Sequence, residues 1–183
     1  MRKIISFILI SFLFIACKEE ILPKPTGYLS LRYPANSYQK LDIERPYTFE
    51  ISTLANAKNQ QKKWLKIHYP ALKASIDITY RPVEQNLREL LIEAEKLVYE
   101  HAVKAEEITT KNFENLNKKV YGSVQEILGN AASQIQFHVT DSTQHFIKGA
   151  LYFYTKPNYD SILPAVAYIK KDITHLIETL EWK

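Results

Sequence analysis

Hydrophobic and polar residues alternate with a period of two in several short runs of the chain. Residues 28–34, 47–52, 64–69 and 74–80 each place apolar or aromatic side chains on one face and polar ones on the other. This alternation is typical of a strand with one buried face. A short link joins the third and fourth runs, so we expect them to pair as an antiparallel hairpin. The polar stretch 56–63 is interpreted as a loop.

A helical period replaces the alternation after Pro82. It predicts an amphipathic helix of about six turns that packs one face on a sheet. A partner-binding face would show the same period, but a core-facing stripe is the commoner cause. The apolar positions that carry this period are Leu87, Leu90, Leu91, Ala94, Val98, Ala102 and Ala105.

Three further runs, 119–128, 133–140 and 145–155, have strand character, whereas 106–117 is assigned to no element. The last run is apolar on both faces, which fits a central strand covered on both sides. Turn-forming residues separate the three runs: Gly129-Asn130 lies before the second, and Asp141-Ser142-Thr143 lies before the third.

The C-terminal segment again has a helical period. Asp160 or Ser161 is expected to cap this helix, with Pro164 in its first turn. Its buried stripe consists of Val166, Ile169, Ile173, Leu176, Ile177 and Leu180. The order of strands, helix, strands and helix predicts an α+β fold, with a mostly antiparallel sheet between two main helices. This order resembles the PsbP-like sandwich.

The N-terminus has the pattern of a secretory signal. Arg2 and Lys3 precede a short apolar run that is too short to cross a bilayer comfortably and ends at Cys17, the only cysteine. Residues 13–17 resemble a bacterial lipobox, although Phe14 replaces the usual leucine. We therefore expect residues 1–16 to be a lipoprotein signal peptide and Cys17 to be the lipidated residue. An ordinary signal peptide with a chance cysteine is the alternative.

This reading divides the chain into three parts. Residues 17–27 form a lipidated tether, in which Pro23 and Pro25 favour an extended backbone, and residues 28–183 form a single α+β domain. Lys18-Glu19-Glu20 is either a solvated leader or a signal that sends lipoproteins to the outer face of the outer membrane. The expected location is the cell envelope, with the leaflet left open.

Charge gives no reason to expect a nucleic-acid partner. Of the 24 Lys and Arg residues, Arg2 and Lys3 belong to the signal, which leaves 22 basic residues against 20 acidic ones. The basic character of the whole chain is therefore partly a property of the signal peptide. The expected partners are the membrane, through the N-terminal lipid, and other envelope proteins.

Motifs for common enzyme chemistry are missing from the sequence. It contains no phosphate-binding glycine loop, no His-Glu-x-x-His and no Gly-x-Ser-x-Gly. No two of its five histidines lie three or four residues apart, so we predict no helical metal pair and no cofactor. His138 has the opposite parity to Ile135, Phe137 and Val139, and we expect it on the solvent side or at the rim of the sheet.

Two groups of residues are candidates for catalysis. Asp141, Ser142 and His145 are the right types for a nucleophilic triad, but their adjacency is more typical of a turn between strands. Asp77 shares a strand face with other polar residues, but glycoside chemistry would require a second carboxylate across a cleft. We therefore predict a protein without catalytic residues.

Longer stretches of the sequence resemble the gliding-motility lipoprotein GldD family, and together they cover nearly all of the mature chain. They are Pro-Lys-Pro at 23–25, Pro-Tyr-Thr-Phe-Glu at 46–50, Tyr-Pro-Ala-Leu-Lys-Ala-Ser-Ile-Asp-Ile-Thr-Tyr at 69–80, Lys-Val-Tyr-Gly at 119–122, Gly-Asn-Ala-Ala-Ser at 129–133, Val-Thr-Asp-Ser-Thr-Gln-His-Phe at 139–146, Gly-Ala-Leu-Tyr-Phe at 149–153 and His-Leu-Ile-Glu-Thr-Leu-Glu-Trp-Lys at 175–183. Arg45 and Lys63 stand where the family often has cysteines, so a family disulfide would be absent from this chain.

The resemblance implies a non-catalytic component or assembly factor of the gliding motility and type IX secretion apparatus. A second hypothesis is an envelope module that binds glycans or lipids, because many tyrosines could line a groove. Those tyrosines are Tyr28, Tyr33, Tyr38, Tyr47, Tyr69, Tyr80, Tyr152 and Tyr154. A third hypothesis is a hydrolase that uses Ser142 and His145.

Overall fold

The computed structural model describes residues 33–183 apart from 42, 61–63, 102 and 156–157. Cys17, the signal peptide and the tether lie outside these residues. In chain order the elements are β1 Tyr38–Lys40, β2 Tyr47–Thr48, β3 Glu50–Ser52, β4 Asn56–Asn59, β5 Leu65–Tyr69, β6 Ala74–Pro82, α2 Leu87–His101, β7 Ala105–Asn115, β8 Val120–Gly129, β9 Ile135–Thr140, β10 His145–Phe153, α3 Tyr159–Thr179 and β11 Glu181–Trp182.

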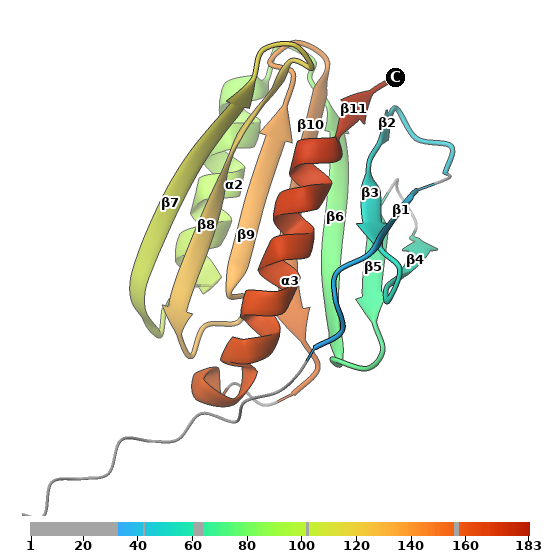
Figure 1. Ribbon diagram of the computed structural model, residues 1–183. Helices are drawn as coiled ribbons and strands as arrows, with labels where there is room; N and C mark the ends of the chain where they lie inside the picture. Colours follow the sequence, from blue (N-terminus) through green and yellow to red (C-terminus); the bar gives the residue numbers. More distant parts are fainter. Residues whose placement is uncertain (1–32, 42, 61–63, 102, 156–157) are drawn as a thin grey trace, which may run out of the picture.

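A seven-stranded antiparallel sheet with the order β4-β5-β6-β10-β9-β8-β7 is the centre of the fold. Figure 1 shows α3 in front of this sheet and α2 behind it. The predicted α+β fold, with two helices flanking a mostly antiparallel sheet, is therefore confirmed. The expected hairpin is β5 paired with β6, with Ile67 opposite Ile76.

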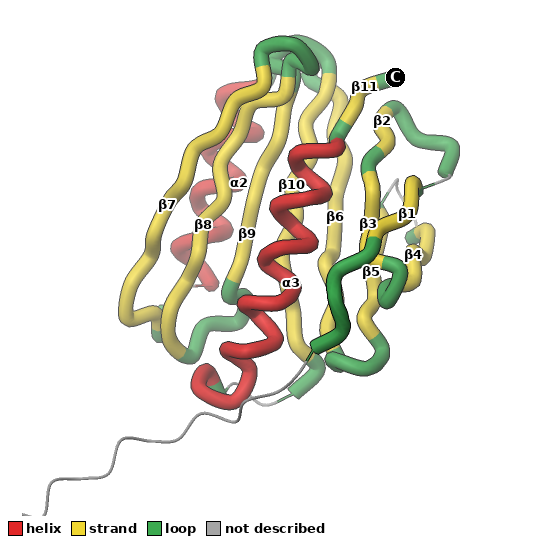
Figure 2. Tube along the Cα trace, viewed as in Figure 1, coloured by secondary structure: helices red, strands yellow, loops and turns green. Residues whose placement is uncertain are grey.

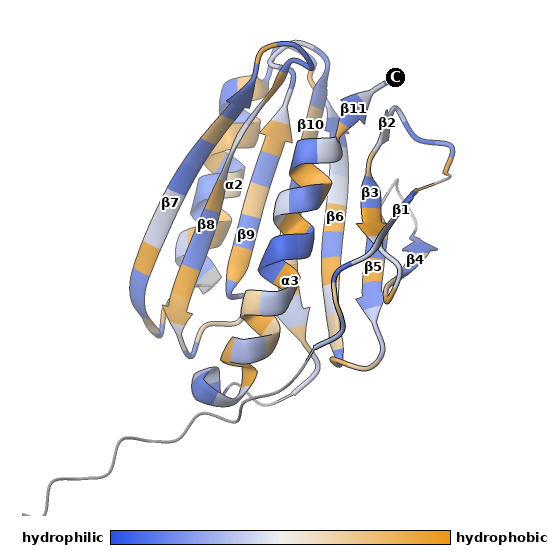
Figure 3. Ribbon diagram, in the orientation of Figure 1, coloured by the Kyte–Doolittle hydropathy of each residue, from blue (hydrophilic) through white to orange (hydrophobic). Residues whose placement is uncertain are grey.

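The main core lies between the sheet and α3. Alternate residues of β6 and β10, such as Ile76 and Ile147, point to this face and are buried. Ile169 and Ile173 of α3 pack on them, and the apolar stripe of the helix faces the sheet in Figure 3. Full burial of one such side chain contributes about 1.5 to 3 kcal/mol, so this face supplies most of the hydrophobic stabilisation.

The opposite face of the sheet carries α2, which lies over β9 and β10. Leu90 and Ala94 of α2 pack on Phe146 of β10. Phe146 and the neighbouring Ile147 belong to the cores on opposite sides of the sheet. The expected two-sided central strand is therefore β10.

Residues 33–37 form an extended loop that runs beside α3 (Figure 2). The ring of Tyr33 stacks on that of Tyr168, with 4.8 Å between the centroids. Asn36 donates a hydrogen bond to the buried carboxylate of Asp172, which also accepts one from the Tyr69 hydroxyl. The described chain therefore starts on the α3 face.

Some predicted elements have different limits in the structure. The first helix ends at His101, and the unassigned stretch after it forms β7. Part of the predicted loop 56–63 is β4. Both strands are at sheet edges and largely exposed, so they lack the alternation of apolar residues that marks a buried face. Of the predicted strand 28–34, only Tyr33 and Pro34 are described, and neither is in a strand.

The start of the last helix also differs from the prediction. Asn158, rather than Asp160 or Ser161, is the N-cap of α3, and its side chain makes no capping hydrogen bond. Pro164 is the sixth residue of the helix and so lies in its second turn. The hydroxyl of Ser161 instead donates to the carbonyl of Asn158.

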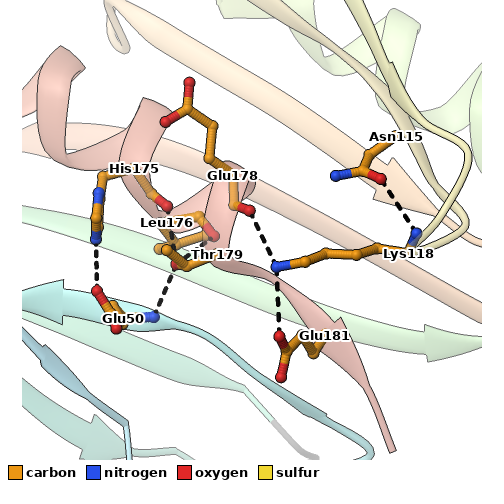
Figure 4. A network of polar contacts seen from close by, with 8 residues as sticks. All are labelled: Glu50, Asn115, Lys118, His175, Leu176, Glu178, Thr179 and Glu181. Atoms are coloured by element: carbon orange, nitrogen blue, oxygen red, sulfur yellow. Dashed lines mark hydrogen bonds and ion pairs between the residues drawn. The ribbon is translucent and has the colours of Figure 1, made fainter.

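Polar contacts hold the C-terminal end of α3 (Figure 4). The last turn of the helix contains no basic residue. Lys118, from the link between β7 and β8, donates to the carbonyl of Glu178 at 3.4 Å and places a cation at the negative end of the helix dipole. On the other side, the amide of Glu50 donates to Thr179 Oγ1 at 3.0 Å. The helix end is thus fixed both to the β7–β8 link of the seven-stranded sheet and to β3 of the small β1-β3 sheet.

Gly149 on β10 gives a test of the packing under α3. An added Cβ would collide with the ring of Phe137 on the neighbouring β9. We expect Gly149→Ala to reduce the free energy of unfolding by about 1 to 3 kcal/mol, because the ring is buried and cannot move freely. Urea denaturation measures this loss.

The double variant Gly149→Ala with Phe137→Leu is the matched control. The smaller side chain makes room for the new methyl group, so the double variant should lose less stability than the sum of the two single losses. Strictly additive losses would show that the close approach of Gly149 and Phe137 does not limit packing here.

Candidate functional site

A cleft opens on the α2 side of the sheet, where the helix does not cover β5, β6 and part of β10. Its volume is about 530 Å³. Leu90, Glu93 and Leu97 of α2 form one wall, and Trp64 lies at the other. Its sheet side includes Lys66, Asp77, Thr79, Arg81, Lys148, Ala150 and Tyr152. The strand register brings these side chains together, since Asp77 pairs with both Lys66 and Ala150, and Thr79 pairs with Lys148.

Glu93 is at the centre of the first charge network in the cleft. Its carboxylate accepts a hydrogen bond from Lys148 Nζ at 2.8 Å and another from Arg81 Nη1 at 3.2 Å. The hydrogen bond from Lys148 is the main cause that lowers the pKa of Glu93, and the charges of Lys148 and Arg81 lower it further. Glu93 is therefore ionised at neutral pH and joins α2 to two strands of the sheet.

The second network is a closed ring of four side chains. Lys66 Nζ donates to the Tyr154 hydroxyl at 3.2 Å, which donates to Ser75 Oγ at 2.9 Å. Ser75 Oγ donates to Asp77 Oδ1 at 2.7 Å, and Lys66 Nζ lies 3.2 Å from Asp77 Oδ2. Burial would lower the pKa of Lys66, but its hydrogen bonds to Tyr154 and Asp77 raise it. Lys66 is thus a fixed cation and not a general base.

The residues considered for a catalytic triad form a turn, as predicted. Asp141 Oδ1 accepts the backbone amides of Thr143, Gln144 and His145 at 2.8 to 3.0 Å. Burial raises the pKa of Asp141, but these hydrogen bonds outweigh burial and lower it. Ser142 has a positive φ of 68° within the same turn. The Asp141 carboxylate therefore binds backbone amides of the turn and does not orient an imidazole, as the acid of a catalytic triad would.

The two histidines discussed above have structural partners. His145 Nδ1 lies 2.9 Å from the hydroxyl of Tyr80. His138 does lie on the face opposite Phe137, but it is half-buried and not on the solvent side, because α2 covers this part of the sheet. Its ring stacks on Phe146, and burial lowers its pKa. Neither histidine belongs to a cluster of potential metal ligands, and the described part of the chain contains no such cluster.

The tyrosines do not line one groove. Tyr47 and Tyr69 are buried in the main core, and Tyr80 is buried beside His145. Tyr33 and Tyr38 stack on residues of α3. Tyr28 lies outside the described residues. Of the described tyrosines, Tyr152 alone lines the cleft.

The alternation of the sequence predicts Asp77 on a polar strand face, but it does not predict the rest of the cleft. The alternation of side chains along each strand could have identified more residues of the cleft. Lys148 and Tyr152 lie on one face of β10, and Asp77 and Arg81 lie on one face of β6. The position of Glu93 depends on how α2 crosses the sheet. That crossing is a property of the fold and not of a local pattern.

A comparison with protein families assigns this chain to a known family. The family described as gliding motility lipoprotein GldD matches residues 18–182. The chain belongs to the GldD family. The resemblance found in the sequence is thereby confirmed, and the protein is a gliding-motility-related lipoprotein. A comparison with curated proteins finds no match.

Arg45 joins two segments of the chain through hydrogen bonds. Arg45 Nη2 donates to the backbone carbonyl of Trp64 at 3.2 Å and to Asn59 Oδ1 at 3.1 Å. These hydrogen bonds join the segment between β1 and β2 to the end of β4 and to the residue before β5.

Asp141→Ala tests the structural role of the turn. Loss of the acceptor for three amides should reduce the free energy of unfolding by about 1 to 3 kcal/mol at pH 7. The folded-state pKa of Asp141 is lowered, so its contribution is complete above the ordinary Asp pKa of about 3.9 and is lost as pH falls through the folded value. The difference from wild type should therefore shrink below about pH 4 in urea titrations.

Ser142→Ala is the control in the same turn. The alanine keeps the backbone conformation, so its effect should stay within about 0.5 kcal/mol at either pH. An Asp141→Ala variant as stable as Ser142→Ala would contradict the role given to the carboxylate.

Proposed function

We propose that this GldD-family protein is a non-catalytic component or assembly factor of the gliding motility and type IX secretion apparatus. The observation that carries the proposal is the family match, which covers residues 18–182. Through its lipid the protein belongs to the cell envelope, where its partners are other proteins of the same machinery.

The chemistry of the described residues supports a role without catalysis. Asp141 holds a turn, His145 contacts Tyr80, and Lys66 remains protonated within its ring of hydrogen bonds. The acids and bases that could attract a catalytic interpretation therefore have structural partners. The cleft is suited to recognition, because its polar groups are held in fixed positions by each other.

The proposed attachment is a lipid on Cys17. None of the helices in the described ranges is long and apolar enough to span a membrane. Two or more acyl chains give stable attachment, since each buried methylene contributes about 0.8 kcal/mol. The lipid would keep the domain at the membrane, where the local concentration of envelope partners is high.

Deletion of the chromosomal copy tests the role in the apparatus. We expect loss of surface spreading and of secretion of proteins with type IX signals, measured on agar and in culture supernatants. Complementation with Ser142→Ala should restore both, because the serine hydroxyl has no role in the proposed mechanism. Normal spreading and secretion in the deletion strain would contradict the proposal, and failure of Ser142→Ala would favour the hydrolase hypothesis.

Cys17→Ser tests the anchor. Without the thiol, diacylglycerol cannot be transferred, so the precursor should keep its signal peptide. The described domain starts after the tether and should fold normally, whereas spreading should fall towards the level of the deletion. Envelope fractionation and a spreading assay at equal expression measure the two effects. A processed variant in the usual membrane fraction, with normal spreading, would show that the cysteine is incidental.

A further inference from the structure

Trp64 has an unusual position for a large aromatic side chain. It is 52% exposed, and among the exposed large hydrophobic residues of the described chain it is the one that lines the cleft. Other large aromatic residues of the described chain, such as Tyr47, Phe49 and Phe137, are buried in the core. An indole ring exposed beside a hollow offers a flat apolar surface to a ligand with one apolar face.

The charges around Trp64 are already paired. Asp77 contacts Lys66, and Glu93 contacts both Arg81 and Lys148. A charged ligand would have to compete with these ion pairs. A ligand with neutral hydroxyl groups would not, because a guanidinium carries five N–H donors and a carboxylate about four lone-pair sites, more than these pairs use. The cleft thus combines an apolar platform with fixed donors and acceptors for neutral polar groups.

We propose that this cleft binds a neutral glycan, with one sugar ring stacked on Trp64. A pyranose ring has an apolar C–H face for the indole and a rim of hydroxyl groups for the charged side chains. The volume of about 530 Å³ falls within the ordinary range of ligand sites. An acyl chain fits less well, since it would remove water from Lys66 and Asp77 without replacing their hydrogen bonds.

The cleft is accessible in the described structure. Thr79 and Ala150 leave room on its sheet side, because both side chains are small. The first described residues pack on α3, on the opposite face of the sheet. A ligand in the cleft therefore displaces no described segment. This inference goes beyond the proposed role in motility, and binding is measured without reference to motility.

Titration of the full chain in detergent with sugar probes tests the inference. The neutral probes are linear trimers of β-1,4-linked glucose and of β-1,4-linked N-acetylglucosamine. The comparison probe is an acidic trigalacturonate. Calorimetry should show saturable binding of at least one neutral trimer. In a Trp182→Phe background, which leaves Trp64 as the remaining tryptophan, the same trimer should shift the tryptophan emission to shorter wavelength.

Two variants should weaken or block this binding in different ways. Trp64→Ala removes the stacking surface and should weaken the affinity about ten-fold or more. Thr79→Leu fills the cleft and should block the ligand while Trp64 remains in place. Tyr99→Ala is the matched control, because Tyr99 is also exposed but lies outside this cleft. It should bind like wild type, and circular dichroism should show that all three variants are folded.

Three results would overturn the inference. The first is the absence of binding by both neutral trimers. The second is a preference for trigalacturonate, which would assign the cleft to an anion. The third is unchanged affinity in Trp64→Ala and Thr79→Leu, which would place the sugar elsewhere on the protein.

Discussion

The antiparallel register of β5, β6 and β10 determines both the core and the cleft. In a strand, successive side chains point to opposite faces, so a shift of one residue would exchange the two sets. In β6 the correct register buries Ile76 and Ile78 under α3 and leaves Asp77 on the other side. A shifted register would bury Asp77 and Lys66 without water, at a cost of several kcal/mol per ion. The apolar core therefore also holds the charged groups of the cleft in place.

The two helices cover the sheet unequally, and this difference creates the cleft. α3 packs along the main core, and contacts from Lys118 and Glu50 fix its C-terminal end. α2 is shorter and packs over β9 and β10, where Leu90 and Ala94 meet Phe146. The strands that α2 does not reach carry polar residues on the same face of the sheet, and these side chains can remain in contact with water. The ion pairs of Glu93 then connect the edge of the helix to the uncovered strands.

Sequence patterns predicted the elements that bury a face and missed those that do not. The stripe of α3 and the alternation in β5 and β6 identified these elements because burial selects apolar residues at regular spacing. β7 and β4 are edge strands in which exposed residues dominate, so their sequences carry little such signal. The cleft was missed for a further reason: Trp64, Glu93 and Lys148 are distant in sequence, and only the crossing of α2 over the sheet brings them to one site.

Stability and recognition depend on different side chains of the same strands. The buried face of β10 contains Ile147 and Leu151, whose loss would leave cavities in the main core. Exposed groups on the cleft side, such as Trp64 and Arg81, add little to core packing. Substitutions on the cleft side can therefore change ligand preference at small cost in stability. The α3 face therefore maintains the fold, and residues on the α2 face can change to suit the ligand that the protein binds.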